Sequence, residues 1–176
     1  MDSQVLLFAI IAIVILTPIC IFGLVYMYYG VRYMLPYVPS SKKSIDDMLA
    51  HIDDVQNSTL LDLGSGTGDI LLEVARRGGR AIGIEVIPFL VWITRWRAAR
   101  EGLSDKITVI CADMFSTKLP NADIVTLYVL AKPTAQLAPK LAAELPNAKV
   151  ISHGFPLPGW TPTFESTEVK VYTFKP

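Results

Sequence analysis

The sequence has few of the residues that build metal sites or disulfide frameworks. Among its 176 residues there are two cysteines and two histidines. Cys20 and Cys111 lie far apart along the chain, and so do His51 and His153. None of the spacings that hold zinc or pair cysteines occurs. We therefore expect neither a disulfide-stabilised fold nor a bound metal ion.

An excess of positive charge is also missing. The chain has 16 basic and 16 acidic residues, and of these only Arg32 and Asp2 lie before residue 40. The remainder is therefore formally neutral, and it shows no basic stripe. Because proteins that bind nucleic acids usually carry a basic patch, we expect no nucleic-acid partner.

Charged residues are absent from one long stretch near the N-terminus. None occurs between Ser3 and Val31, and residues 5–29 are almost continuously apolar. A helix of that length measures roughly 37 Å, whereas the apolar core of a bilayer is about 30 Å thick. We predict a transmembrane anchor in residues 1–34, with its helix at about 5–29, followed by a linker at 35–43.

Two other interpretations of this stretch are weaker. A cleaved signal peptide starts with basic residues and ends at a small-residue cleavage site, whereas this chain starts with Asp2 and has no such site. A buried helix of a soluble protein has a polar stripe, and none is visible. Since Arg32, Lys42 and Lys43 all follow the stretch, the positive-inside rule places the rest of the chain in the cytoplasm. Without an Arg-rich, Ser-rich transit segment, we expect a prokaryotic plasma membrane.

Residues 44–176 alternate between short apolar strands and helices, the first of which Ser44 is expected to cap. This alternation is typical of an α/β fold with a mostly parallel sheet and helices on both faces. We predict a Rossmann-like α/β domain that ends in a short antiparallel hairpin. Strands are expected at 59–63, 80–86, 106–111, 122–129 and 148–153, helices at 44–52, 69–77, 88–101 and 134–145, and the hairpin at 163–166 and 169–174.

A glycine-rich loop follows the first of these strands. Asp62 lies at the end of the strand, and Gly64, Ser65, Gly66 and Gly68 come next, directly before a helix. Glycines permit positive φ angles and a close approach of the backbone to a ligand. The N-terminus of the following helix favours an anionic group. The pattern indicates a nucleotide-like ligand, and a tight turn without a ligand is the alternative.

The second strand ends in Glu85, 21 residues after Gly64, where a carboxylate can accept hydrogen bonds from ribose hydroxyls. Dinucleotide sites have the spacing G-x-G-x-x-G, but here the third glycine comes one residue early and Asp69 follows it. The spacing G-x-G-x-G behind a strand-ending acid instead resembles the first motif of class I methyltransferases. This resemblance implies S-adenosyl-L-methionine as cofactor, with its methionine part at the loop and its ribose at Glu85.

Three further residues are candidates for the adenine end of this site. Asp113 follows the third strand and resembles the family position near the adenine amino group. Ile87 and Met114 are apolar neighbours that could enclose the adenine ring. The alternatives are a turn or helix cap for Asp113 and ordinary core packing for the other two.

The methyl acceptor is expected at the carboxyl ends of the strands. The Asn/Asp-Pro-Pro-Tyr motif of DNA and amino-group methylases is absent there, although Tyr128 follows the fourth strand. Tyr128 and Trp160 are our candidates for an aromatic acceptor slot, and simple packing is the alternative for each. His153 is a candidate proton relay or, alternatively, a structural loop histidine.

Three segments carry a closer resemblance: Pro-Tyr-Val-Pro at 36–39, Val-Thr-Leu-Tyr at 125–128 and Phe-Pro-Leu-Pro-Gly-Trp at 155–160. They resemble the family of the mitochondrial lysine methyltransferases of the ATP synthase c-subunit and the adenine nucleotide translocase, which is similar to the archaeal broad-specificity protein lysine methyltransferases. One departure is Ile-Pro-Phe at 87–89, where eukaryotic members favour Asn-Pro-Trp. The resemblance implies methylation of protein lysines, membrane proteins among the substrates.

Two other functions stay open at this point. The first is a methyltransferase that acts on a small molecule or a lipid at the membrane. The second is a non-catalytic scaffold that binds the cofactor or has lost it. The presence of Asp62, Glu85 and Asp113 beside the glycines argues against loss.

Overall fold

The computed structural model describes residues 3–33 and 40–173. The chain divides into two compact units, 1–37 and 38–176. The Pro-Tyr-Val-Pro segment at 36–39 and much of the expected linker lie outside the described residues.

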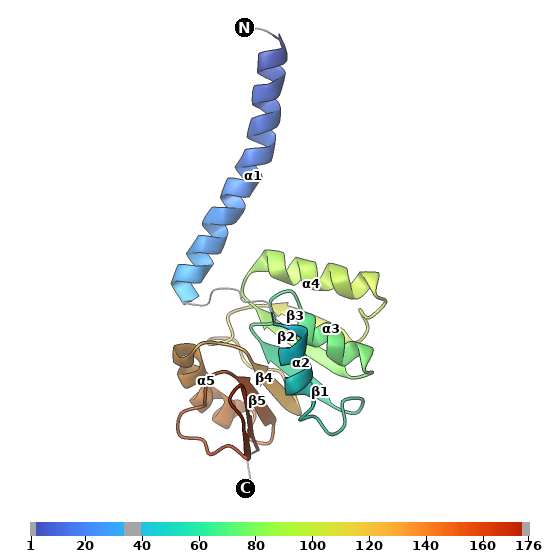
Figure 1. Cartoon of the computed structure of the whole chain (residues 1–176), viewed down its shortest axis with the longest axis vertical. Helices are drawn as coiled ribbons and strands as arrows, with labels where there is room; N and C mark the ends of the chain where they lie inside the picture. The colour runs from blue at the N-terminus through green and yellow to red at the C-terminus, as the bar shows by residue number, and fades with distance from the viewer. Residues whose placement is uncertain (1–2, 34–39, 174–176) are drawn as a thin grey trace. The chain divides into compact units, whose positions relative to one another are not determined.

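The first unit is a single helix, α1 (Ser3–Tyr33), drawn in blue in Figure 1. It continues through Pro18, which membrane helices tolerate. Its side chains, where described, are exposed although most are apolar. By length and composition, Ser3–Val25 can cross a bilayer, with a mean hydropathy of 3.1. The expected apolar helix is therefore present, and its insertion into a membrane stays a prediction.

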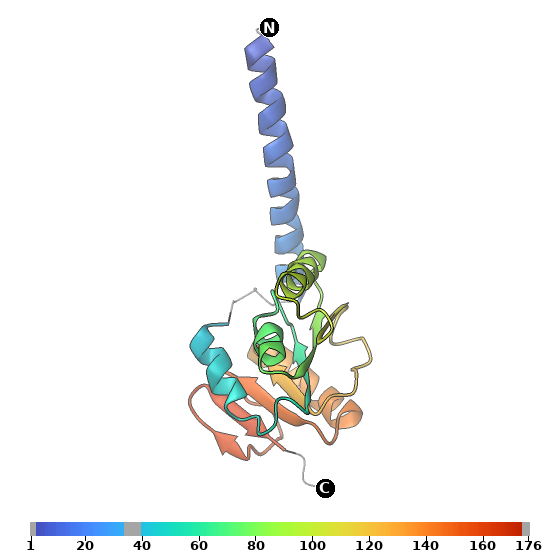
Figure 2. The same cartoon turned by 90° about the vertical axis from the view of Figure 1, so that its right-hand side faces the viewer.

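The second unit alternates strands and helices, drawn in Figure 1 and Figure 2. Its elements are α2 (Lys42–Leu49), β1 (Thr59–Leu63), α3 (Asp69–Arg76), β2 (Arg80–Glu85), α4 (Pro88–Arg100), β3 (Ile107–Cys111), β4 (Ile124–Leu127), α5 (Ala131–Glu144), β5 (Lys149–His153), β6 (Phe164–Glu165) and β7 (Val169–Tyr172). The strands form a seven-stranded sheet in the order β3-β2-β1-β4-β5-β7-β6. Strands β1 to β5 are parallel, whereas β7 runs antiparallel between β5 and β6. The predicted Rossmann-like sheet with a closing hairpin is confirmed.

Side chains alternate between the two faces of the sheet, and both faces are buried. Leu60, Ala81 and Ile107 form one row across three strands and share a buried cluster with residues of α2, α3 and α4. The next residue of β1, Leu61, points to the opposite face and is fully buried, as is Leu137 of α5. Parallel sheets need helices on both faces because the side chains of both faces are apolar and must be shielded from water.

Two helices begin earlier than expected, and the first of them, α2, also ends earlier, at Leu49 rather than near residue 52. α2 begins at Lys42 because Ser41, and not Ser44, is its N-cap: the Ser41 hydroxyl oxygen accepts the Ser44 N–H at 3.0 Å. α5 begins at Ala131 rather than at residue 134. Pro133 lies in its first turn, where the missing N–H is not needed, and the fourth strand accordingly ends before residue 129.

Candidate functional site

The glycine loop, residues 64–68, connects the carboxyl end of β1 to α3. Gly64, Gly66 and Gly68 have φ angles of 83°, 54° and 79°, the left-handed region that glycine adopts at little cost. The N–H groups of Gly64 and Ser65 both donate to the Ile84 carbonyl, at 2.9 and 3.1 Å. The backbone of the loop is therefore fastened to the neighbouring strand β2.

Helix α4 packs directly against this loop. A Cβ atom at Gly68 would lie 2.3 Å from Thr94 Cγ2, so a larger residue there displaces buried structure. The Thr94 side chain is fully buried, and its hydroxyl donates to the Gly66 carbonyl at 3.1 Å. On the other side, a Cβ at Gly83 would lie 2.5 Å from Ser65 Oγ. The loop is thus held between β2 and α4 with little space to spare.

The Glu85 carboxylate connects the loop to the turn that follows β2. Its two oxygens accept the N–H groups of Gly66 and Ile87, each at 2.9 Å. Burial raises the pKa of Glu85, and these N–H groups oppose the rise. Because each carboxylate oxygen can accept more than one hydrogen bond, Glu85 retains capacity for a ligand hydroxyl. It therefore has a structural role that does not depend on its predicted ribose contact.

Asp62 is buried beside Thr126, its register partner on β4. The Thr126 hydroxyl donates to Asp62 Oδ1 at 2.7 Å. Burial raises the pKa of Asp62 to about 7, in spite of this hydrogen bond, and the charges of Glu85 and Asp69 add to the rise. A cationic group brought to this carboxyl would favour its charged form.

The chemistry of the groups at the loop tests whether the site suits a ligand. The Ser65 hydroxyl finds no hydrogen-bond partner among the described residues and packs under the loop against Gly83, away from any ligand. Two buried carboxyls, Asp62 and Glu85, remain beside the glycines. They are acceptors that match the ammonium and hydroxyl donors of S-adenosylmethionine. The residues present therefore fit this cofactor.

The adenine candidates have structural roles of their own. The Asp113 carboxylate accepts the Phe115 N–H at 2.9 Å and so stabilises the turn after β3. This is the turn role that was the alternative to an adenine contact. Ile87 and Met114 are both buried. Contact of these three residues with adenine stays a prediction.

The two aromatic candidates for the acceptor slot have different neighbours. Tyr128, which directly follows β4, meets the His153 ring edge-on, with ring centroids 4.4 Å apart. His153 is buried, and its Nε2 lies 3.5 Å from Glu168 Oε2 without hydrogen-bond geometry. Trp160 meets Tyr172 edge-on, with centroids 5.8 Å apart. The structure therefore pairs Tyr128 with His153, which sequence reasoning had treated separately.

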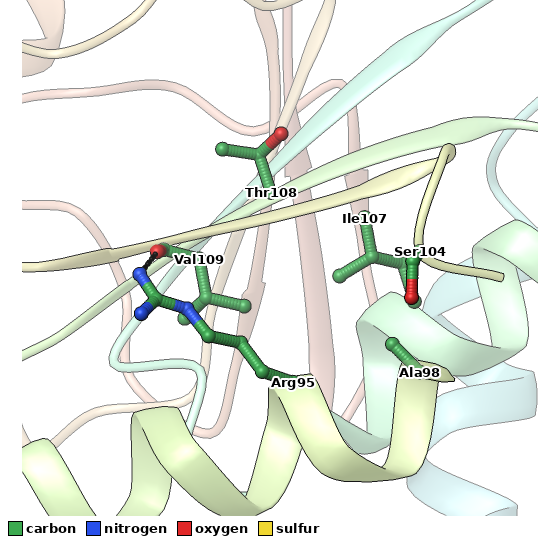
Figure 3. A pocket seen from close by; sticks show the side chains of 6 residues that line it. All are labelled: Arg95, Ala98, Ser104, Ile107, Thr108 and Val109. Atoms are coloured by element: carbon green, nitrogen blue, oxygen red, sulfur yellow. Dashed lines mark hydrogen bonds between the residues drawn. The ribbon is translucent and has the colours of Figure 1, made fainter. Parts of the chain in front are cut away.

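A hollow of about 290 Å³ lies elsewhere, between α4 and the outer strand β3 (Figure 3). Arg95 reaches across it and donates to the Val109 carbonyl at 2.6 Å. This carbonyl lies on the free edge of the sheet, and occupying it discourages pairing with another strand. None of the residues predicted for the cofactor site lines this hollow.

Sequence reasoning missed three residues that support the loop. Gly83 had a detectable signal, because a glycine inside a strand often marks a close approach. Thr94 had a weaker one, as a hydroxyl inside a helix. Arg97 had none: its Nη1 donates to the Thr67 carbonyl and to Asp69 Oδ1, both at 2.7 Å, and neither partner is near it in the sequence.

The strand order, the antiparallel β7 and the glycine loop after β1 together define the class I methyltransferase fold. The chain belongs to the family described as the ANTKMT methyltransferase domain, whose model matches residues 62–164. The predicted family resemblance is thereby confirmed.

Known relatives agree with this assignment. The human lysine N-methyltransferase of the ATP synthase c-subunit is 35% identical over 73% of this chain and 55% of its own length. A protein-lysine N-methyltransferase of Saccharolobus islandicus is 29% identical over 73% of this chain and 81% of its own. The structure described as an RNA methyltransferase from Salinibacter ruber with S-adenosyl-L-homocysteine is 34% identical, has a TM-score of 0.73, and is matched over 78% of this chain and 94% of that one.

The bound S-adenosyl-L-homocysteine in the Salinibacter structure is consistent with the predicted cofactor. The chain spans little more than half the length of the human, mouse and Xenopus relatives that it matches.

Proposed function

We propose that this chain is an S-adenosyl-L-methionine-dependent methyltransferase that acts on lysine side chains of proteins and is anchored in a membrane. The observation that carries the proposal is the glycine loop, held by Glu85 and Thr94, with the buried carboxyl of Asp62 beside it. The lysine acceptor is supported by the names of the human and Saccharolobus relatives, which both specify lysine N-methylation.

The cofactor-binding residues in this proposal are those at the ends of β1, β2 and β3. The loop and Asp62 bind the amino-acid part, and Glu85 accepts hydrogen bonds from the ribose. Asp113, Ile87 and Met114 surround the adenine. The cofactor supplies an electrophilic methyl group on a sulfonium.

The chain's own part in the reaction is mainly alignment. The acceptor nitrogen must be held about 3 Å from the methyl carbon, in line with the bond that breaks. It must also be neutral, although a free lysine has a pKa of about 10.4. An apolar slot lowers that pKa because burial disfavours the charged form. Tyr128, packed on His153, and Trp160 form the walls of this slot in our proposal, so no dedicated base is required.

The membrane anchor in the proposal is Ser3–Val25 of α1. Its apolar side chains are exposed wherever they are described, and a bilayer would cover them. The positions of Arg32, Lys42 and Lys43 after the apolar stretch support a cytoplasmic location of the second unit. An anchored enzyme meets membrane proteins at a high local concentration, which suits a substrate of the kind that the human relative's name specifies.

Two competing acceptors follow from particular observations. The Salinibacter structure is described as an RNA methyltransferase, whereas the formally neutral second unit disfavours RNA. A lipid acceptor would also profit from the anchor. A scaffold without activity is disfavoured by the complete set of cofactor-binding candidates.

The experiment offers membrane proteins, RNA and extracted lipids separately to the full chain with methyl-labelled S-adenosylmethionine. We expect label in protein, recovered as methylated lysine after hydrolysis. Label in RNA or in lipid alone would contradict the lysine acceptor. Absence of transfer to all three, with the cofactor bound, would support the scaffold instead.

A further inference from the structure

Helix α4 presents an exposed aromatic face. Phe89, Trp92 and Trp96 are 44%, 60% and 50% exposed. Their spacing puts them on one side of a helix, and the Phe89 and Trp92 rings stack with centroids 5.9 Å apart. The other large apolar side chains exposed in the described part of the second unit, Leu130, Phe155 and Phe164, lie on separate elements.

The charge on α4 has one sign. The helix contains Arg95, Arg97 and Arg100 and no acidic residue. The Arg100 guanidinium lies over the Trp96 ring, 5.4 Å from its centroid, so cation and aromatic ring form one surface. Tryptophan rings and arginines on apolar stems are the side chains that suit the boundary between lipid and water.

We propose that α4 is a second membrane contact, which lies on the surface of an anionic bilayer with Trp92 and Trp96 at the level of the lipid headgroups. The inference rests on the anchor in our proposed function. Between Tyr33, the last residue of α1, and Ser40 there are seven peptide steps, which reach at most about 25 Å. The second unit is therefore tethered near the bilayer.

A tether of this length makes a weak contact effective. Surface binding of the helix becomes intramolecular, so few aromatic side chains suffice. A second copy of the chain is a poorer occupant, because a two-fold interface centred on this aromatic face would bring the two copies of Arg100 close together.

The contact has a consequence for the site. Thr94 and Arg97, on the inner side of α4, bind the carbonyls of Gly66 and Thr67 in the glycine loop. Docking of α4 therefore fixes the orientation of the cofactor site relative to the bilayer. Lysines close to the membrane surface are the substrates that such an orientation favours.

The chain provides its own probes, since its three tryptophans are Trp92, Trp96 and Trp160. The full chain is reconstituted into vesicles of phosphatidylcholine and phosphatidylglycerol that carry bromine near the headgroup end of the acyl chains. In the Trp160→Phe variant the fluorescence comes from α4 alone. In the Trp92→Phe/Trp96→Phe variant it comes from Trp160. We expect bromolipid quenching to be at least about twofold stronger in the first variant.

Arginine reversal tests the electrostatic part in the Trp160→Phe background. Arg100→Glu should reduce the quenching, whereas Arg80→Glu, a matched reversal at an exposed position on β2, should leave it unchanged. Binding of S-adenosylhomocysteine verifies that each variant is folded.

The outcomes separate the two proposals. Equal quenching of α4 and Trp160 in protein that floats with the vesicles would overturn the α4 contact and leave the anchor intact. Protein that does not float would contradict the anchor itself. A concentration-dependent blue shift of Trp92 and Trp96 in detergent, with no quenching in vesicles, would identify a second copy as the occupant and overturn the lipid contact.

Discussion

The glycine loop after β1 and the proposed acceptor region, formed by Tyr128, His153 and Trp160 at or after the ends of β4 and β5, differ in the kind of interaction that holds them. At the loop, hydrogen bonds from β2 and α4 hold the backbone. The Ile84 carbonyl and the Glu85 carboxylate accept N–H groups of the loop, and the Thr94 hydroxyl donates to the Gly66 carbonyl. In the acceptor region, aromatic rings pack against one another, as Tyr128 does on His153. The hydrogen-bonded loop tolerates little change, whereas Tyr128 lies in the connection between β4 and α5, where a side chain can be altered while the fold persists.

This difference suits a division of labour. Binding of one constant cofactor needs a loop of fixed shape, whereas in our proposal the side chains after β4 and β5 select the acceptor. Substitutions in the glycine loop should therefore lower the cofactor affinity, whereas substitutions in the acceptor region should lower the turnover.

The largest effect is expected for Gly68→Ala. The new Cβ would occupy a left-handed position and meet Thr94 Cγ2 at 2.3 Å. Strain and overpacking together should cost about 3 kcal/mol and lower the affinity for S-adenosylhomocysteine about 100-fold. Thermal unfolding and calorimetry measure the two quantities.

Gly102→Ala is the matched control, because Gly102 also has a positive φ, of 70°, but no atom within 4 Å of the added Cβ. It should cost about 1 kcal/mol and leave affinity unchanged. Adding Thr94→Ser to Gly68→Ala removes the clashing methyl group and should restore part of the affinity. Equal losses in the two alanine variants would show that the contact with α4 is unimportant.

The next effect concerns pH. Asp62 has a folded pKa of about 7 against an ordinary value of 3.8, so between these values the folded state binds the extra proton. Stability should therefore fall as pH rises through this window, by about 2 kcal/mol between pH 5 and pH 7. Denaturant unfolding of wild type and Asp62→Asn across that range isolates the contribution, since the asparagine oxygen can still accept from Thr126. Parallel curves for the two proteins would exclude a raised pKa at Asp62.

Glu85→Gln should have a somewhat smaller effect. An amide presents one accepting oxygen to the two N–H groups of Gly66 and Ile87, so one donor is left unsatisfied at a cost of about 1–2 kcal/mol. We expect about a tenfold loss of cofactor affinity. Glu101→Gln, which weakens an exposed ion pair with Arg76, is the control and should change neither affinity nor, measurably, stability. Wild-type cofactor affinity in Glu85→Gln would show that these two hydrogen bonds do not shape the cofactor site.

The smallest effect on cofactor binding is expected on the acceptor side. Tyr128→Leu removes the ring that rests on His153 and should lower the turnover of a lysine substrate about tenfold. Tyr128→Phe keeps the ring and should restore most of that turnover if packing is its role. A large change in cofactor affinity would show that Tyr128 contributes to cofactor binding and not only to acceptor binding.

The sequence predicted the parts that depend on local pattern. The glycine spacing, the strand-ending Asp62 and Glu85, and the alternation of strands and helices were sufficient for the fold and the cofactor. The family was predicted from the short segments at 36–39, 125–128 and 155–160. Contacts that arise only from tertiary packing could not be predicted from the sequence. Nothing in the sequence near Arg97, for example, indicates that its side chain donates to the Thr67 carbonyl. The N-cap at Ser41 was missed because Ser44, in the same short segment, has equal capping ability.

The central claim is that the glycine loop, and not the aromatic residues of the acceptor region, holds the cofactor. Calorimetric titration of S-adenosylhomocysteine into Gly66→Val and Tyr128→Ala, side by side with wild type, tests it most directly. We predict no measurable binding to Gly66→Val, because its backbone joins Glu85 to Thr94, and binding to Tyr128→Ala within about threefold of wild type. Wild-type affinity in Gly66→Val, or its loss in Tyr128→Ala alone, would contradict the account.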